Sequence, residues 1–221
     1  MSITKIRFVT HAYGGDGYAA AEAAKIPLDA DGVNSAEKLG HYWKLVGYRP
    51  DRIHTTPLVA CSQTARVAAC VFGGGLSSFV EVTEPAELHV TDESLQKIAA
   101  ELTKGDVQAD LASPEEAILD EKARALLTGG QLVRYAIGLR EEDEPPREVI
   151  AVTDHYSINS VVSLTQVGLN ALSQDPSAQL SRMLTRAPQE PCAESLLIAE
   201  GSQAGGDFLL SVMHVGHPTL E

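Results

Sequence analysis

The chain has 221 residues, 44% of them hydrophobic, which is enough to bury one α/β core of ordinary size. Its 17 basic and 30 acidic residues give a formal net charge of −13, which argues against a nucleic-acid partner, because such partners require clustered Lys and Arg. No run of 18 apolar residues occurs, so no membrane span is predicted. The first ten residues predict no secretory leader, and three widely spaced cysteines predict neither a disulfide framework nor a metal knuckle, so we expect a cytoplasmic protein.

The first apolar run leads directly to a histidine. Lys5–Gly17 (KIRFVTHAYGGDG) begins with alternating apolar residues, reaches His11 and then becomes rich in glycine. A strand followed by an abrupt turn is typical of the carboxyl edge of an open α/β sheet, where ligand sites collect. Tyr13 is close enough to His11 in sequence to contact a ligand there. The glycines around it are only weak evidence for nucleotide binding.

Helical and strand patterns alternate through the first two thirds of the chain. The first helix is expected at Ala36–Val46, capped by Asn34 or Ser35 after a turn at Asp29–Gly32. The elements predicted after it are a strand Arg52–Thr55, a helix Leu58–Phe72, a strand Phe79–Val82, a helix Glu93–Leu102 and a helix Pro114–Leu127 that stops at Thr128–Gly130. After this stop, Gln131–Leu139 could continue helically. His54 lies near the end of the second strand and could join a site at that edge.

A second apolar strand, Glu148–His155 (EVIAVTDH), also ends on a histidine. The elements expected after it are a helix Ser157–Leu172 and two strands, Glu194–Ala199 and Phe208–His214, joined by a glycine hairpin. This order predicts a three-layer α/β/α sandwich with a mostly parallel central sheet, in a single domain over residues 1–221. We expect the two histidines to converge at one edge of that sheet. The exposed terminal hairpin could pair with a second copy, giving a homodimer.

Four blocks resemble, in the same order, motifs of the histidine phosphatase (phosphoglycerate-mutase-like) superfamily: FVTHA at 8–12, PLDADGVNSA at 27–36, RIHTTPLVACSQTA at 52–65 and VIAVTDHY at 149–156. The resemblance spans nearly the whole chain and implies the phosphoglycerate-mutase-like fold. It also implies that His11 is the nucleophile that takes up a phosphoryl group and that His155 is its partner. The two arginines that hold the phosphate in this family do not carry over, because Thr10 and Ala60 stand in their places.

Two further positions differ from the family pattern, one by a larger side chain and one by a charged side chain. Ala12 replaces the glycine after the nucleophile, and Asp154 precedes the second histidine, where a small residue is usual. The carboxylate of Asp154 would repel a phosphate dianion, and would raise the pKa of His155 if their side chains met; alternatively, it caps the next helix. Losing one catalytic donor commonly costs ~100- to 1000-fold in rate, so losing both arginines predicts weak phosphatase activity. Arg7 and Arg66 are the nearest substitutes.

Three functions stay open. In the first, His11 and His155 act as an acid–base pair, or as nucleophile and base, on a neutral or less anionic small molecule, with Thr10 donating a hydrogen bond. In the second, the chain binds a ligand or partner without catalysis. In the third, it is a residual phosphohydrolase with His11 as phosphoryl acceptor. We favour the first, because drift would erode histidines as readily as arginines.

The remaining polar residues have mainly structural interpretations. No cofactor is expected, and the spacing of the two histidines matches no metal motif. The general-acid glutamate implied by the resemblance would fall near Glu84 or Glu87, without a clear match. Gln63 and Thr64 are expected to serve helix packing and capping, and Cys61 to be a buried, inert thiol.

Overall fold

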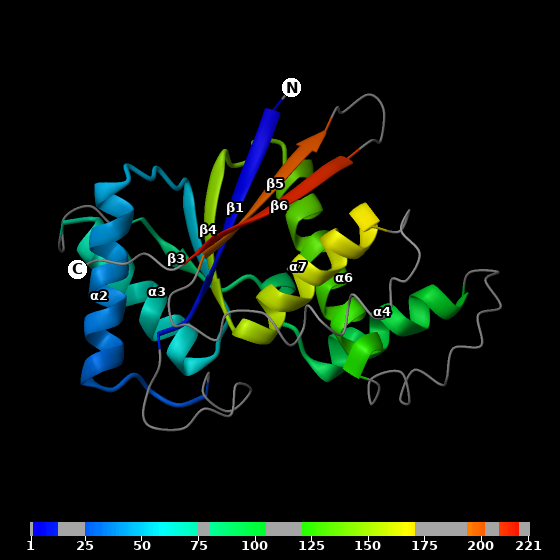
Figure 1. The fold of residues 1–221 in the computed structure, drawn as a ribbon, viewed down its shortest axis with the longest axis horizontal. Helices are drawn as coiled ribbons and strands as arrows, with labels where there is room; N and C mark the ends of the chain where they lie inside the picture. Colours follow the sequence, from blue (N-terminus) through cyan, green and yellow to red (C-terminus); the bar gives the residue numbers. More distant parts are fainter. Residues whose placement is uncertain are drawn as a thin grey trace.

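In the part of the chain that the structure describes, six strands form one sheet in the order β3-β2-β4-β1-β5-β6 (Figure 1). The computed structural model describes residues 2–12, 25–74, 80–104, 121–170, 194–201 and 208–216, the last two ranges by their backbone. The strands are β1 Ser2–Thr10, β2 Arg52–Thr55, β3 Val82–Thr83, β4 Glu148–Thr153, β5 Glu194–Gly201 and β6 Phe208–Gly216. Strands β3, β2, β4 and β1 are parallel neighbours, and β5 and β6 add an antiparallel pair. The predicted mostly parallel sheet is confirmed.

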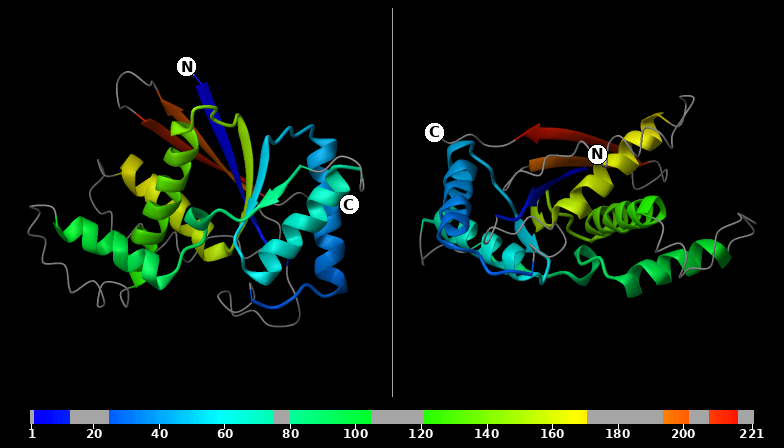
Figure 2. Two further views of the ribbon diagram at one scale, coloured as in Figure 1. Left: turned by 180° about the vertical axis from the view of Figure 1, so that it is seen from behind. Right: turned by 60° about the horizontal axis from the view of Figure 1, so that its bottom comes forward.

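Helices cover both faces of this sheet, which confirms the three-layer α/β/α sandwich. In Figure 2, α2 and α3 lie on one side of the strands, and α4, α6 and α7 lie on the other. The helices are α2 Ala30–Leu45, α3 Val59–Phe72, α4 Asp92–Lys104, α6 Glu121–Glu141 and α7 His155–Asn170, with a short 3-10 helix η1 at Ala86–Leu88. Among the helices in the described ranges, none is long and apolar enough to cross a membrane.

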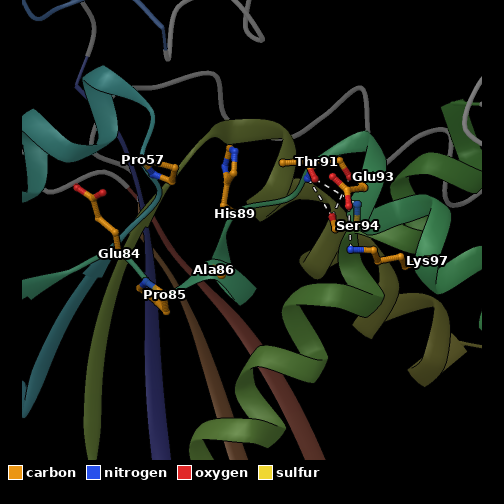
Figure 3. A pocket seen from close by; sticks show the side chains of 9 residues that line it. All are labelled: Pro57, Glu84, Pro85, Ala86, His89, Thr91, Glu93, Ser94 and Lys97. Carbon is orange, nitrogen blue, oxygen red and sulfur yellow. Dashed lines mark hydrogen bonds and ion pairs between the residues drawn. The ribbon is translucent and has the colours of Figure 1, made fainter.

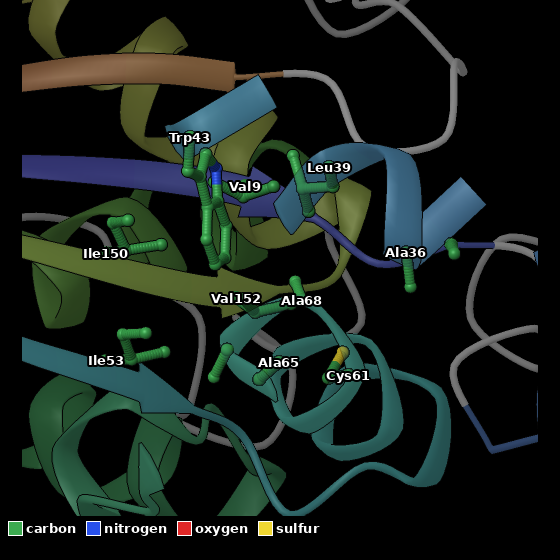
Figure 4. Packing of buried hydrophobic residues seen from close by; sticks show 12 residues of the cluster. Val9, Ala36, Leu39, Trp43, Ile53, Cys61, Ala65, Ala68, Ile150 and Val152 are labelled. Atoms are coloured by element: carbon green, nitrogen blue, oxygen red, sulfur yellow. The ribbon is translucent and has the colours of Figure 1, made fainter. Parts of the chain in front are cut away.

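Alternation of side chains along the strands divides the core in two. The face toward α2 and α3 buries a cluster centred on Trp43, whose members include Val9, Ile53, Ile150 and Val152 (Figure 4). The opposite face packs the other residues of the same strands against α6 and α7, namely Ile6, Phe8, Val149 and Ala151. Successive strand residues point to opposite faces, so the continuous apolar runs of β1 and β4 are those of strands buried on both sides.

The register of the parallel strands places their carboxyl ends side by side. Thr10 of β1 pairs with Thr153 of β4, and Thr55 of β2 pairs with Val152. One residue further, the His11 N–H donates to the carbonyl of Thr153 at 3.2 Å. The segment after β1 therefore starts beside the residue that precedes α7.

Helix α2 begins six residues before the predicted start, so the predicted turn at Asp29–Gly32 is wrong. Asp29 is the N-cap, and its Oδ1 accepts a hydrogen bond from the N–H of Gly32 at 2.7 Å. The first turn is mostly exposed, and its buried residue is Gly32, so it contributes no apolar periodicity to the sequence. An Asp cap followed by an acidic residue in the first turn was the available signal.

Helix α6 runs straight through Thr128–Gly130, so the predicted stop there is wrong. A Cβ added at Gly129 would lie 2.6 Å from the carbonyl oxygen of Ser160 in α7. Gly129 is therefore a point of close approach between two helices rather than a terminator. The predicted helix before it, Pro114–Leu127, lies partly outside the described residues.

Candidate active site

The two histidines that end the apolar strands lie next to each other. His11 follows β1 directly, and His155 is the first residue of α7, two positions earlier than the predicted helix start. Their ring centroids are 5.5 Å apart, with an angle of 79° between the ring planes. The exposed fractions are 0% for His11 and 4% for His155, so this pair, which we call the histidine dyad, is enclosed by protein.

The ring of His11 has a defined orientation. Its Nδ1 lies 2.7 Å from the carbonyl oxygen of Ala12. A carbonyl oxygen can only accept a hydrogen bond, so Nδ1 carries a proton, and in the neutral ring Nε2 carries the lone pair. Burial lowers the pKa of His11, while the bond to Ala12 and the charge of Asp154 act in the opposite direction. The buried ring therefore favours the neutral form, which can act as a base or a nucleophile at Nε2.

Asp154 caps α7. Its Oδ1 accepts from the N–H of Ser157 at 2.9 Å, and its Oδ2 accepts from the Ser157 hydroxyl at 2.7 Å. The N-terminus of a helix attracts anions, and here the protein's own carboxylate takes that place. The negative charge of Asp154 is close enough to His11 to oppose the lowering of its pKa by burial. A phosphate dianion at the dyad would meet this charge.

The three small residues at which the sequence resemblance implies an arginine or a glycine are all buried. Thr10 is 3% exposed, and Ala12 and Ala60 are 0% exposed. The methyl group of Ala12 belongs to the core cluster on the α2/α3 face, so its carbonyl, rather than its side chain, reaches His11. Ala60 lies in the first turn of α3. The remaining predicted site residue, Tyr13, lies outside the described residues.

The nearest possible substitutes for the arginines are held elsewhere. Arg7 Nε lies 2.6 Å from Glu148 Oε1, and the guanidinium stacks 3.7 Å above the ring of Tyr48. Arg66 pairs with Glu84 at 3.3 Å, and its side chain is 64% exposed. Glu148 is the first residue of β4, and Tyr48 lies four residues before β2, so both are at the opposite end of the sheet from the dyad.

The structure places His54 away from the dyad. It pairs in register with Ala151, which pairs with Phe8, three residues before His11. Its Nδ1 lies 2.6 Å from the hydroxyl of Tyr135 in α6. Burial, together with the positive charge of Arg52, lowers the pKa of His54 to about 4. His54 is a neutral core histidine, because the alternation of β2 directs it toward α6.

One residue beside the dyad was not predicted to act there. Thr64 Oγ1 accepts from the N–H of Ala12 at 3.0 Å and donates to the carbonyl of Ala60 at 2.7 Å. Its neighbour Gln63 accepts from the N–H of Leu28 at 2.7 Å, a packing role as expected. The thiol of Cys61 is buried, and burial raises its pKa, which fits an inert cysteine.

A cavity of about 430 Å³ lies between η1, the start of α4 and the turn before α3 (Figure 3). Its lining includes Pro57, Glu84, His89 and Lys97. Pro57 is the second residue after the carboxyl end of β2, so the cavity borders the same edge of the sheet as the dyad. Of the two glutamates considered as general acid, Glu84 lines this cavity and Glu87 does not. In the described ranges, no three His, Cys, Asp or Glu side chains form a metal-binding group.

Comparison with solved structures decides the fold. A mycobacterial protein described as hydrolase 2 superposes with a TM-score of 0.62 at 13% identity, covering 98% of this chain and 92% of that one. Phosphoglycerate mutase from Bacillus anthracis str. Sterne gives a TM-score of 0.59 at 14% identity, with 98% and 94% covered. The chain has the phosphoglycerate-mutase-like fold.

A third structure with this phosphoglycerate-mutase-like fold, the mycobacterial glucosyl-3-phosphoglycerate phosphatase, gives a TM-score of 0.58 at 12% identity and covers 97% of this chain and 99% of that one. By sequence, no family model and no curated protein matches the chain. The resemblance read from the four sequence blocks is therefore confirmed at the level of the fold. At such low identity, the chemistry has to be argued from the residues themselves.

Proposed function

We propose that the chain is an enzyme that uses the histidine dyad for acid–base or nucleophilic chemistry on a neutral or weakly anionic small molecule. The observation that carries this proposal is the approach of two buried imidazoles to a centroid distance of 5.5 Å at the carboxyl edge of a parallel sheet. Ligand sites of open α/β sheets collect at this edge. Conventional phosphatase or mutase activity is then weak or lost.

The orientation of His11 suits either form of this chemistry. Its Nε2 lone pair can accept a proton from a substrate X–H group, or attack an electrophilic centre directly. His155 would then act as the second base, or return a proton to the leaving group. Thr10 supplies a hydroxyl as a neutral hydrogen-bond donor in the place of the first arginine.

Charge argues against an ordinary phosphoryl substrate. Phosphoryl transfer requires mainly positioning and positive charge around the equatorial oxygens, which planar guanidinium groups provide bidentately. Thr10 and Ala60 offer a hydroxyl and a methyl instead, and Asp154 contributes a carboxylate whose field reaches His11. The substrate that fits such a site carries little negative charge at its reacting group.

A second candidate, a residual phosphohydrolase with His11 as phosphoryl acceptor, is favoured by one specific observation. The neutral His11 ring presents its lone pair at Nε2, as a histidine nucleophile must, and solved structures of this fold include a phosphatase and a mutase. The third candidate, a protein that binds a ligand without catalysis, requires only an enclosed site that can hold the ligand.

A substrate screen with two variants separates these candidates. Turnover would be measured on a panel of neutral esters, amides and sugars and on p-nitrophenyl phosphate, for the wild type, His11→Gln and the control His54→Gln. The proposal expects turnover of a non-phosphorylated substrate that disappears in His11→Gln and persists in His54→Gln. Release of phosphate that depends on His11 would favour the second candidate, and no turnover on either class would favour the third.

Assembly and location are part of the same proposal. Strand β6 is an edge strand of the sheet, and an edge strand can pair with the same strand of a second copy of the chain. A cytoplasmic homodimer that acts on a small molecule is therefore the form we propose. A monomer mass by light scattering would contradict the dimer without affecting the chemistry.

A further inference from the structure

Thr64 connects the segment that carries His11 to the first turn of α3. The N–H of Ala12 donates to Thr64 Oγ1 at 3.0 Å, and the Thr64 hydroxyl donates to the carbonyl of Ala60 at 2.7 Å. Ala12, Ala60 and Thr64 are all 0% exposed, so neither bond competes with solvent. Bonds in such a low-dielectric interior are strong, and consecutive bonds polarise one another.

The direction of each bond is fixed by chemistry. A hydroxyl has one proton, and the carbonyl of Ala60 can only accept it, so the oxygen of Thr64 is left to accept from Ala12. Donation from a helical Thr to the carbonyl four residues back is common and by itself only local. The second bond is not local, because it joins residues 52 positions apart in the chain.

Ala12 is consequently held at two points. Its N–H is bound to Thr64, and its methyl group is packed in the core cluster on the α2/α3 face. With these two points fixed, its carbonyl is directed at Nδ1 of His11, 2.7 Å away. The carbonyl in turn determines which nitrogen of the ring carries the proton.

We propose that Thr64 is a positioning residue that fixes the Nδ1–H tautomer of His11 through Ala12 and so keeps the lone pair on Nε2. Its use in catalysis rests on the proposed function, but the tautomer itself is a property of the free protein. In this proposal, Thr64 acts on His11 through the backbone of Ala12.

The test is ¹⁵N NMR of the histidine ring nitrogens in the full chain, with the His11 signals assigned by their loss in His11→Gln. Thr64→Val keeps the size of the side chain and removes both bonds, whereas Thr64→Ser keeps the hydroxyl. The matched control is Thr128→Val, because Thr128 is also buried in a helix, and its hydroxyl has no hydrogen-bond partner among the described residues.

We expect the wild type, Thr64→Ser and Thr128→Val to show Nδ1 protonated and Nε2 unprotonated in neutral His11. In Thr64→Val, the Nδ1–H form should cease to dominate, and the Nε2–H form should appear. A folded Thr64→Val protein with an unchanged His11 tautomer would overturn the proposal, as would Thr64→Ser failing to preserve the wild-type pattern.

A measurement on the wild type keeps the proposal testable if Thr64→Val does not fold. The N–H of Ala12 should exchange with deuterium as slowly as the core amides of β1, and rapid exchange at Ala12 would overturn the proposal. Failure here is distinguishable from failure of the proposed function. The tautomer can be correct in a protein without turnover, and turnover that depends on His11 can occur without control by Thr64.

Discussion

The two ends of the parallel sheet hold different basic side chains, which do different things. At the amino end, Arg7 is bound to Glu148 and stacked on Tyr48, and Arg52 forms a bidentate pair with Glu142 at 2.8 and 2.6 Å. At the carboxyl end lie the dyad and buried Thr10 and Ala60, the two positions at which the sequence resemblance implies arginines. The guanidinium groups at the amino end thus form ion pairs that hold neighbouring elements together, whereas two imidazole rings lie side by side at the carboxyl end.

The difference shows that burial alone does not identify a site in this molecule. His54 is as buried as the dyad and its pKa is strongly lowered, yet it is bound to Tyr135 in the middle of a core. His11 and His155 are distinguished by their position, one residue and two residues beyond the ends of neighbouring parallel strands. On the proposed function, position at the strand ends is a better indicator of the site than burial.

The largest expected effect is the contrast between the dyad and His54. His11→Gln or His155→Gln should reduce turnover by about 100- to 10,000-fold, because each removes an acid–base or nucleophilic group. His54→Gln should leave turnover per folded molecule within about threefold of the wild type, since a core histidine does not take part in chemistry. Steady-state rates on the substrate found by the screen measure this. Equal losses in all three variants would contradict the distinction.

The second effect is on stability against pH. Because the pKa of His54 is lowered to about 4, the unfolded chain binds a proton between pH 6.5 and 4 that the folded chain excludes. The free energy of unfolding should therefore fall as the pH is lowered through this window, by on the order of 3 kcal/mol. Urea unfolding at several pH values measures the slope.

His54→Gln should flatten this slope, leaving the smaller part that His11 contributes in the same direction. His41→Gln, at an exposed histidine, is the control for replacing a histidine by glutamine. An unchanged slope in His54→Gln would show that His54 is not excluded from protonation in the folded state.

The third effect follows from restoring the missing cations. Thr10→Arg combined with Ala60→Arg should raise hydrolysis of p-nitrophenyl phosphate by about 100-fold, if the dyad is intact and only the guanidinium groups are absent. Both positions are buried, so the larger side chains should also cost about 1–3 kcal/mol of stability. Val59→Arg, on the exposed side of the same turn, is the control for added charge. A folded double variant without increased hydrolysis would contradict the assignment of these positions.

The smallest effect concerns the amino end alone. Arg7→Met should reduce the free energy of unfolding by about 2 kcal/mol, because it removes charge-assisted hydrogen bonds whose partners are only partly exposed. It should leave turnover unchanged. The exposed Arg66–Glu84 pair provides the comparison, and Arg66→Met should cost less than about 1 kcal/mol. Loss of turnover in Arg7→Met would place this arginine in the functional machinery.

Much of the fold was accessible from local patterns. The apolar strands and the turns after them predicted a parallel sheet, and the two strand-terminal histidines predicted a meeting point that the structure also shows. These inferences hold because hydrophobic periodicity and strand alternation act over a few residues. The terminal antiparallel pair was predictable for the same reason.

Helix boundaries that depend on packing were not accessible. Gly129 reads as a helix stop in sequence, but its function is to let α6 approach the backbone of Ser160 in α7. The contacts around the dyad also depend on packing between elements that are distant in the sequence. The bond from Ala12 to Thr64 joins two elements whose approach no local pattern encodes, and the partner of His54 became visible only when α6 was placed against β2.

If the two histidines are in place but no cationic side chain binds anions beside them, inorganic phosphate should bind only weakly, and calorimetric titration of phosphate into the wild-type protein measures this. We expect no saturable binding at phosphate concentrations up to about 1 mM, which corresponds to a binding free energy weaker than about 4 kcal/mol. Binding tighter than about 0.1 mM that disappears in His11→Gln would contradict it. That result would mean that another cationic side chain binds the phosphate in place of the two arginines and that the protein performs ordinary phosphate chemistry.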